Sequence, residues 1–267
     1  MRFGRCWIGG TVGLVEGRVA LVTGGGRGIG RGISLRLATE GASVAVNYRK
    51  DREAADATVA EIIAGGGIAK AYGGSVDDPQ ADAAMVDAVI ADFGGIDILV
   101  NNGGTASRGR AVADTDENEV LRLLATHAIG PHHLSRLVLP SMRTRGRGDV
   151  VMISSTATTQ MAGNGAPYNM GKAAMEALAM TLAKEERHNG IHVNIVSPGL
   201  VESDMGVRLA KAMGSPDIRA LDAVSPFGRV CQPDDIAKVV VWLCSEGAGY
   251  VTGQNIRVDG GGQLRSY

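Results

Sequence analysis

The 267-residue sequence predicts an α/β fold in which βαβ units build a parallel sheet. Two observations support this prediction. Short apolar runs have the length of buried strands, and segments with helical spacing separate them. The predicted strands cover residues 18–23, 42–47, 68–72, 97–101, 149–154, 191–196 and 254–258. Because no Pro- or Ser-rich linker or charge run divides the chain, we expect one domain over residues 14–267, preceded by an extension at 1–13.

The first predicted strand leads into a glycine-rich turn. Residues 23–30 read TGGGRGIG, and an apolar pattern with helical spacing follows them. Glycines permit a tight turn and a close approach of the backbone to a phosphate, while the free N–H groups at a helix N-terminus attract an anion. The chain holds 39 glycines in all, so the position of this turn between strand and helix matters more than its composition. It predicts a dinucleotide site.

A second motif follows the fifth predicted strand. Pro167 precedes an apolar run that predicts a helix from about Tyr168, and Lys172 lies four residues later on the same helical face. An ammonium beside the phenol stabilises the phenolate and brings its pKa down from about 10. Tyr168 is therefore a candidate general acid/base, with Ser155 thirteen residues before it. Since the same pair also occurs on ordinary amphipathic helices, the other motifs decide between these interpretations.

Together, these motifs resemble the short-chain dehydrogenase/reductase family over about residues 14–263, and in particular its 3-oxoacyl-[acyl-carrier-protein] reductase-like members. The resemblance is carried by residues 23–30, Asn101-Asn102-Gly103-Gly104, Ser155 with Tyr168 and Lys172, Ser197-Pro198-Gly199, and Val258-Asp259-Gly260-Gly261. It implies a single Rossmann-type domain: a doubly wound parallel sheet of about seven strands with helices on both faces.

The resemblance also implies a function, an NAD(P)(H)-dependent oxidoreductase that interconverts a ketone and a secondary alcohol by hydride transfer. Ser155 is then expected to hydrogen-bond the substrate oxygen, and Tyr168 to give or take its proton. Lys172 is expected to lower the pKa of Tyr168 and to bind the nicotinamide ribose. We expect Ser154 to point the other way on its strand and to pack. No metal site is expected.

The same resemblance assigns the cofactor contacts. They are Gly24, Arg27, Gly28, Ile29, Gly30, Arg49, Ser75, Val76, Asn102, Gly103, Gly104, Tyr168, Lys172, Pro198, Gly199, Val201 and Ser203. Ser75 stands where the family has an Asp that bonds the adenine amino group, so we expect weaker adenine binding.

Cofactor preference is predicted from the end of the second strand. Tyr48 stands where NAD-dependent members place an Asp, and no acid occurs before Asp51. Arg27 and Arg49 can meet a 2′-phosphate. We therefore expect NADP(H) to be preferred, with NAD(H) possible.

His127 occupies the position of the family's active-site Asn. Pro131, four residues later, has no N–H to bond the His127 carbonyl and bends its helix, so that carbonyl would be free to hold a water of the proton relay. An imidazole titrating near pH ~6.5 would then add an acidic limb to the rate profile. The alternatives are a packed core histidine, a poor enzyme, or a non-catalytic dinucleotide-binding sensor.

Substrate identity is left open. We expect a substrate lid at about residues 202–226, where Met205, Leu209, Met213 and Leu221 either line an apolar pocket or pack. A 3-oxoacyl thioester reductase is the alternative activity. Its acidic carrier protein could meet a basic patch, although a solvated loop is the favoured interpretation and Asn189 stands where carrier-protein reductases have a basic residue. The patch consists of Arg143, Arg145 and Arg147.

Composition limits the partners and the compartment. With 27 basic and 28 acidic residues the net charge is −1, so we expect a small-molecule substrate and neither nucleic acid nor membrane as partner. Cys6, Cys231 and Cys244 form no CxxC motif, which favours the reducing cytoplasm. Residues 1–13 lack the apolar core of a signal peptide.

The resemblance further implies a homotetramer. The helix after Tyr168 also carries more apolar residues than one face buried in its own subunit requires, which favours a contact with another subunit. They are Ala173, Ala174, Ala177, Leu178 and Leu182.

Overall fold

A computed structural model describes residues 12–262, so all but the last two residues of the expected N-terminal extension lie outside it. Seven parallel strands form one sheet in the order β3-β2-β1-β4-β5-β6-β7. They are β1 (Val19–Val22), β2 (Ser43–Tyr48), β3 (Ile68–Gly73), β4 (Ile98–Asn101), β5 (Gly148–Ile153), β6 (Ile191–Pro198) and β7 (Asn255–Val258). The predicted strands and the doubly wound sheet are thereby confirmed.

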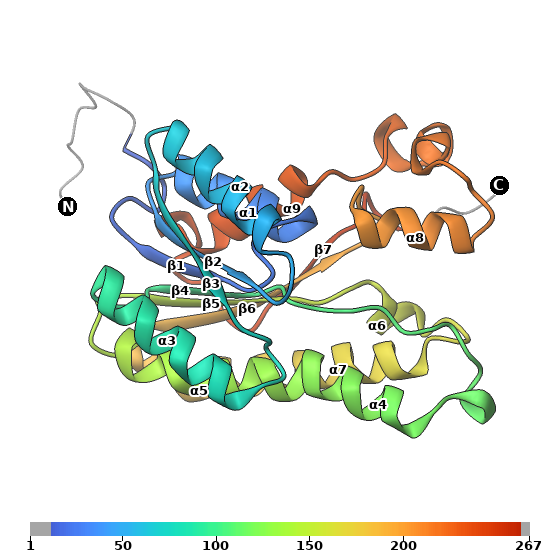
Figure 1. Cartoon of the computed structure of the whole chain (residues 1–267), viewed down its shortest axis with the longest axis horizontal. Coiled ribbons are helices and arrows are strands. Elements are labelled where there is room, and N and C mark those ends of the chain that lie inside the picture. Colours follow the sequence, from blue (N-terminus) through green and yellow to red (C-terminus); the bar gives the residue numbers. More distant parts are fainter. Residues whose placement is uncertain (1–11, 263–267) are drawn as a thin grey trace.

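Helices cover both faces of the sheet, and each face has its own apolar core (Figure 1). On one face lie α1 (Gly28–Thr39), α2 (Arg52–Ala64) and α9 (Pro233–Leu243); on the other lie α3 (Pro79–Phe93), α4 (Glu117–Leu124), α5 (Gly130–Met142) and α7 (Ala166–Glu186). The shorter elements are α6 (Ala157–Gln160), α8 (Asp204–Ala212), the π-helical turn η2 (Ala125–Ile129) and the 3₁₀ turns η1 (Val112–Asp114), η3 (Arg187–Asn189), η4 (Ile218–Val224), η5 (Pro226–Gly228) and η6 (Glu246–Ala248).

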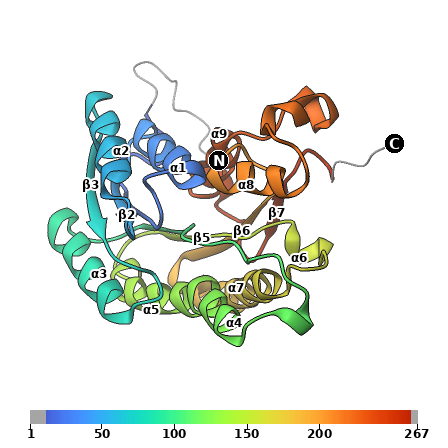
Figure 2. The ribbon, with the colours of Figure 1, turned by 45° about the vertical axis from the view of Figure 1, so that its right-hand side comes forward.

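The strand order reverses between β1 and β4. The chain first builds outward from β1 through β2 to β3, then crosses back and builds from β4 to β7. In such sheets the loops diverge at the carboxyl ends of the two central strands and leave a crevice for a ligand. Figure 2 shows α8 and α6 on opposite sides of the sheet at this end.

The expected lid at residues 202–226 contains α8 and η4 and has a small core of its own. Ala210, Ile218 and Val230 form that core. Leu209 and Met213 are 51% and 62% exposed, so they do not pack in this core, whereas Leu221 packs against it.

The three arginines before β5 form neither a free basic patch nor a solvated loop. Each holds a buried carboxylate at the amino end of the sheet, opposite the crevice. Their hydrogen bonds include Arg143 Nε to Glu186 Oε2 at 3.0 Å, Arg145 Nη2 to Asp97 Oδ2 at 2.8 Å and Arg147 Nε to Asp149 Oδ2 at 3.0 Å. Sequence alone missed this because the acids come from other elements.

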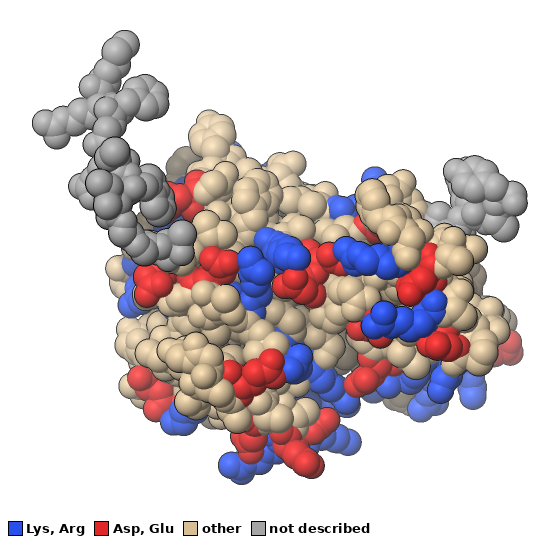
Figure 3. Space-filling model, turned by 90° about the horizontal axis from the view of Figure 1, so that it is seen from above, with Lys and Arg blue, Asp and Glu red and all other residues tan. Residues whose placement is uncertain are grey.

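On the face with α1 and α2, basic and acidic side chains are interspersed rather than gathered by sign (Figure 3). None of the helices within residues 12–262 combines the length and the apolar character needed to cross a membrane.

Candidate active site

The structure brings the predicted site residues to the carboxyl edge of the sheet. The glycine turn lies between β1 and α1, Arg49 follows β2, Ser75 and Val76 follow β3, Asn102 to Gly104 follow β4, Ser155 follows β5, and Pro198 to Ser203 join β6 to α8. His127 lies in η2, and Tyr168 and Lys172 lie in α7. Segments far apart in the sequence therefore meet at one edge of the sheet.

The predicted catalytic helix, α7, begins at Ala166, slightly earlier than expected, with Pro167 in its first turn. Lys172 Nζ lies 5.8 Å from the centroid of the Tyr168 ring. The same ammonium donates a hydrogen bond of 2.6 Å to the carbonyl of Ile153, the last residue of β5. Ser155 follows that strand, and its hydroxyl accepts a bond from the Ala157 N–H. The strand end and the helix thus place the three side chains together.

The titration of this cluster differs from our expectation. Burial raises the pKa of Tyr168, and the hydrogen bond with Ser155 only partly offsets this. Burial also lowers the pKa of Lys172 to about 7, against the opposing charge of Glu176. The pKa of Tyr168 is therefore raised rather than lowered on balance, because burial disfavours the phenolate more than the Ser155 hydrogen bond favours it.

His127 is fully buried, and its ring packs edge-on against Tyr168 with 5.2 Å between centroids. Its Nε2 lies 2.8 Å from the carbonyl of Thr105, and its Nδ1 has no hydrogen-bond partner within the described chain. Burial, followed by the charge of Lys172, lowers the pKa of His127 to about 3. The imidazole is neutral at working pH, so the expected acidic limb near pH 6.5 cannot come from it.

The helical segment that runs from α4 through η2 into α5 is irregular close to Pro131, where we expected a bend. Residues Ala125–Ile129 form a π-helical turn, in which the Gly130 N–H bonds the Ala125 carbonyl five residues before it. Pro131 lies in the first turn of α5. A side chain at Gly171 would lie 3.0 Å from His127 Cβ, so α7 approaches this turn closely only because that residue is glycine. The carbonyl of His127 lacks a donor at position 131.

The glycine turn fits a dinucleotide phosphate. Within the described chain, Arg27 at the N-cap of α1 makes no capping hydrogen bond with its side chain, which leaves the first N–H groups of α1 for an anion. Gly24 has a φ of +60°, which favours glycine. A side chain at Gly30 would lie 2.1 Å from the Gly24 carbonyl, so only glycine permits this close fold of the loop.

Polar side chains that sequence reasoning missed hold this loop. Asn47 Oδ1 accepts a 3.1 Å bond from the Gly24 N–H, and Thr23 Oγ1 accepts a 2.7 Å bond from the Gly103 N–H. Asn102, predicted as a cofactor contact, donates from its amide to the Thr23 carbonyl at 2.8 Å. Thr23 and Asn47 are polar residues at the ends of the predicted strands 18–23 and 42–47, and this is the sequence feature that could have identified them.

The region expected to meet a 2′-phosphate holds charges of both signs. Arg49 is exposed, whereas Arg27 Nη1 lies 3.8 Å from Asp51 and 3.7 Å from Asp204 of α8. Arg27 and Asp204 line a hollow of about 370 Å³ between the glycine turn and the lid. Ser75, which stands where the family has an adenine-binding Asp, donates a hydrogen bond from its hydroxyl to Asp77.

The lid is fixed to the site from both sides. Ser203 caps α8 by accepting the Gly206 N–H at 3.2 Å, and Val201 pairs with Cys231. A side chain at Gly28 would lie 3.3 Å from Ser203 Cβ, so the glycine turn and the lid are in close contact.

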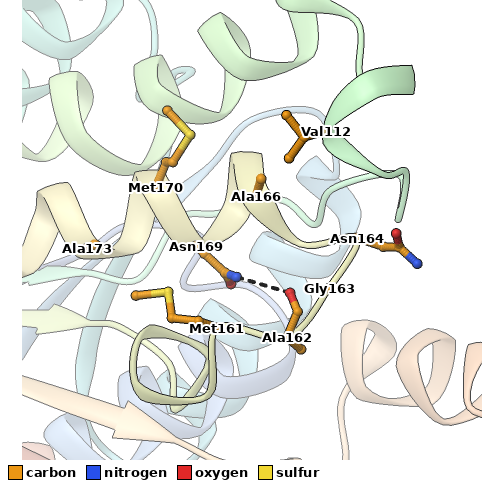
Figure 4. Close-up of a pocket in the computed structure, with 9 residues that line it drawn as sticks. All are labelled: Val112, Met161, Ala162, Gly163, Asn164, Ala166, Asn169, Met170 and Ala173. Atoms are coloured by element: carbon orange, nitrogen blue, oxygen red, sulfur yellow. Dashed lines mark hydrogen bonds between the residues drawn. The ribbon is translucent and has the colours of Figure 1, made fainter.

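A larger hollow of about 420 Å³ lies on another side of α7 (Figure 4). Met161, Asn164, Met170 and Ala173 are among the residues that line it. Ser155, Tyr168 and Lys172 do not, so we distinguish this hollow from the candidate active site.

Ser154 does more than pack. Its hydroxyl donates a 2.5 Å hydrogen bond to Glu176 Oε1 on α7.

Comparisons with known proteins agree with this geometry. A family model described as enoyl-(acyl carrier protein) reductase matches residues 24–263. An uncharacterized oxidoreductase of Methylorubrum extorquens is 38% identical over 247 residues, 92% of this chain and 98% of the relative. A 3-oxoacyl-[acyl-carrier-protein] reductase of Staphylococcus aureus is 37% identical, over 91% of this chain and 96% of the relative.

A solved structure shows the same fold. It is a 7α-hydroxysteroid dehydrogenase in complex with NADH and 7-oxo glycochenodeoxycholic acid, with a TM-score of 0.86 and 34% identity, over 94% of this chain and 96% of that one. The chain belongs to the short-chain dehydrogenase/reductase family. It is an oxidoreductase that interconverts a carbonyl and an alcohol with a nicotinamide dinucleotide.

Proposed function

We propose that Ser155, Tyr168 and Lys172 carry the reaction and that NADP(H) is the preferred cofactor. The observation that carries the assignment is the buried ammonium of Lys172, 5.8 Å from the Tyr168 ring, where Ser155 follows β5. When bound, the nicotinamide supplies or accepts the hydride. In the reducing direction Tyr168 gives its proton to the substrate oxygen, Ser155 hydrogen-bonds that oxygen, and Lys172 stabilises the resulting phenolate.

Turnover by the purified protein tests these roles. NADPH absorbance is followed with a panel of ketones, diketones and acetoacetyl thioesters, with Tyr168→Phe as the control. We expect oxidation of NADPH by wild type and none by the variant. Failure of every substrate would favour the dinucleotide-sensor alternative.

NADPH is expected to bind at least about tenfold more tightly than NADH, a difference of roughly 1.4 kcal/mol. Arg49 supports this because its exposed guanidinium follows β2, where Tyr48 replaces the acid typical of NAD-dependent members. Arg49→Asp should reduce the ratio by removing a cation and adding a repulsive charge. Fluorescence titration measures both affinities, and Lys184→Asp, at the far end of α7, is the charge-matched control. A wild-type ratio near one would refute the preference.

A free ketone is the proposed substrate class, and a carrier-bound 3-oxoacyl thioester is the second candidate. The relatives named 3-oxoacyl-[acyl-carrier-protein] reductase favour the second. The pairing of Arg143, Arg145 and Arg147 with buried acids disfavours it, because these cations are not free for an acidic carrier. The two candidates are distinguished by comparing kcat/KM for the same 3-oxoacyl group attached to a small thiol and to a carrier protein. A much higher value for the carrier-bound form would support the second candidate.

We also propose a homotetramer that works in the cytoplasm. Supporting the assembly, several large apolar side chains are exposed around α4, η2 and α7: Val112, Leu121, Ile129, Met161 and Met170. Leu182, which we had counted with such positions, is in the core. Supporting the compartment, Cys231 and Cys244 are free thiols.

A further inference from the structure

We propose that Glu176 is a positioning residue of this site, which holds the turn that carries Ser155 and supplies a counter-charge to Lys172. The inference rests on the proposed roles of Ser155, Tyr168 and Lys172. It adds to them a residue that contacts none of the reacting atoms.

Glu176 continues the catalytic face of α7. Tyr168, Lys172 and Glu176 are spaced four residues apart, so they follow one another along one side of the helix. Glu176 is half-buried, and its Oε1 accepts two hydrogen bonds. One comes from Ser154 Oγ at 2.5 Å and the other from Thr158 Oγ1 at 2.8 Å.

These two bonds hold the chain on both sides of Ser155. Ser154 follows the end of β5 and is almost fully buried, while Thr158 belongs to α6. Hydrogen bonds to an ionised carboxylate are shorter and stronger than those between neutral groups. One oxygen of α7 thus joins the strand end and the short helix, and Ser155 lies in the turn between them.

The charge of Glu176 acts on the other side, toward Lys172. That ammonium is buried, and within residues 12–262 it donates a hydrogen bond only to the neutral carbonyl of Ile153. The other titratable groups that face it are Tyr168 from its own helix and His127 from η2, whose suppressed pKa leaves it neutral. Among the described residues, Glu176 is the carboxylate that raises the pKa of Lys172. Since a neutral lysine cannot stabilise a phenolate, this counter-charge extends the working range to higher pH.

Matched variants separate the two roles. Glu176→Gln keeps an oxygen acceptor of the same shape and removes the charge. Ser154→Ala and Thr158→Val keep the charge and remove one bond each. Glu185→Gln, on an exposed turn of the same helix, is the control for loss of one acid. Thermal unfolding identifies any variant that does not fold.

The first measurement is the pH profile of kcat and KM for ketone reduction by the holoenzyme. For Glu176→Gln we expect the alkaline limb to move to lower pH by about one unit, with rates within about threefold of wild type near pH ~5, where Lys172 is largely protonated in both. Ser154→Ala should lower kcat across the profile without moving the limb. A profile of Glu176→Gln that superimposes on those of wild type and Glu185→Gln would overturn the proposal.

The second measurement needs no turnover, so it separates a failure here from a failure of the proposed function. The chain has six lysines, and NMR of the free protein labelled with ¹³C at lysine Cε resolves their titrations, with Lys172 assigned by its loss in Lys172→Ala. The Lys172 midpoint should lie at lower pH in Glu176→Gln than in wild type and be unchanged in Glu185→Gln. An unchanged midpoint in Glu176→Gln would refute the electrostatic role even in an active enzyme.

Discussion

At His127 a buried imidazole occupies the place of an amide, and the site suppresses its charge. Its ring supports Tyr168 from the side, and its Nε2 bonds the Thr105 carbonyl. A protonated imidazole here would face the ammonium of Lys172 in an apolar setting, which explains the direction of its pKa. The role we assign to its side chain is packing, while the relay is left to the main chain.

His127→Asn is accordingly expected to retain activity within about tenfold, or roughly 1.4 kcal/mol of barrier. An amide can replace the bond to Thr105, and Pro131 still cannot bond the main-chain carbonyl at 127. Steady-state kinetics with NADPH checks this, and Tyr168→Phe should abolish activity in the same assay. If the wild type were inactive and His127→Asn were active, the idea that the proton relay needs only the main-chain carbonyl at position 127 would be wrong.

Among the elements, we expect the N-terminus of α2 to affect both the stability of the protein and its proposed cofactor preference. Asp51 caps this helix by accepting the Ala54 N–H at 3.1 Å, and it lies 3.8 Å from Arg27. Asp51→Ala should cost about 1 kcal/mol of stability through the lost cap. It should also tighten NADPH binding a few-fold, since it removes a negative charge from the proposed 2′-phosphate region.

Asp116→Ala is the matched control, because Asp116 caps α4 in the same way, with a 2.9 Å bond from Asn118. We expect a similar stability cost and no change in cofactor affinity. Denaturant unfolding and fluorescence titration give both quantities. Weaker NADPH binding by Asp51→Ala would place the 2′-phosphate elsewhere.

The ends of α5 and α7 are joined by the pair of Arg143 and Glu186. Arg143→Ala should destabilise the protein, because it leaves the buried Glu186 carboxylate with less hydrogen bonding. Arg143 lowers the pKa of Glu186. The stabilisation is therefore full above the unfolded carboxyl pKa of about 4.3 and is lost as the pH falls through the lower folded value. Unfolding at pH 7 and pH 3 should show the difference between variant and wild type shrinking in acid.

For the whole molecule, the exposed apolar residues around α7 predict association. Met170 is exposed and lines the hollow in Figure 4. Met170→Glu should shift a tetramer to smaller species, because a charge would have to be buried in the contact. Light scattering at micromolar concentration measures the mass. Ile63→Glu on α2, an equally exposed apolar position across the sheet, should leave the assembly intact. A monomeric wild type would contradict the proposal.

Local sequence patterns were enough to predict the succession of strands along the chain and the edge of the sheet that carries the candidate site. Apolar runs of strand length are local features, and the carboxyl ends of parallel strands necessarily meet at one edge, so Ser155, Tyr168 and the glycine turn could be located in advance. The family resemblance added the roles of these residues, which periodicity does not contain.

The partners of the charged and polar groups, in contrast, became known from the three-dimensional structure. Arg143 forms an ion pair with Glu186. Glu176 accepts a hydrogen bond from Ser154, and Asn47 accepts one from Gly24. In each pair the two residues are more than twenty positions apart in the sequence. The pKa shifts of Tyr168, Lys172 and His127 likewise follow from burial. The physical reason is that desolvation and ion pairing depend on which elements pack together, and local sequence patterns do not specify those distances.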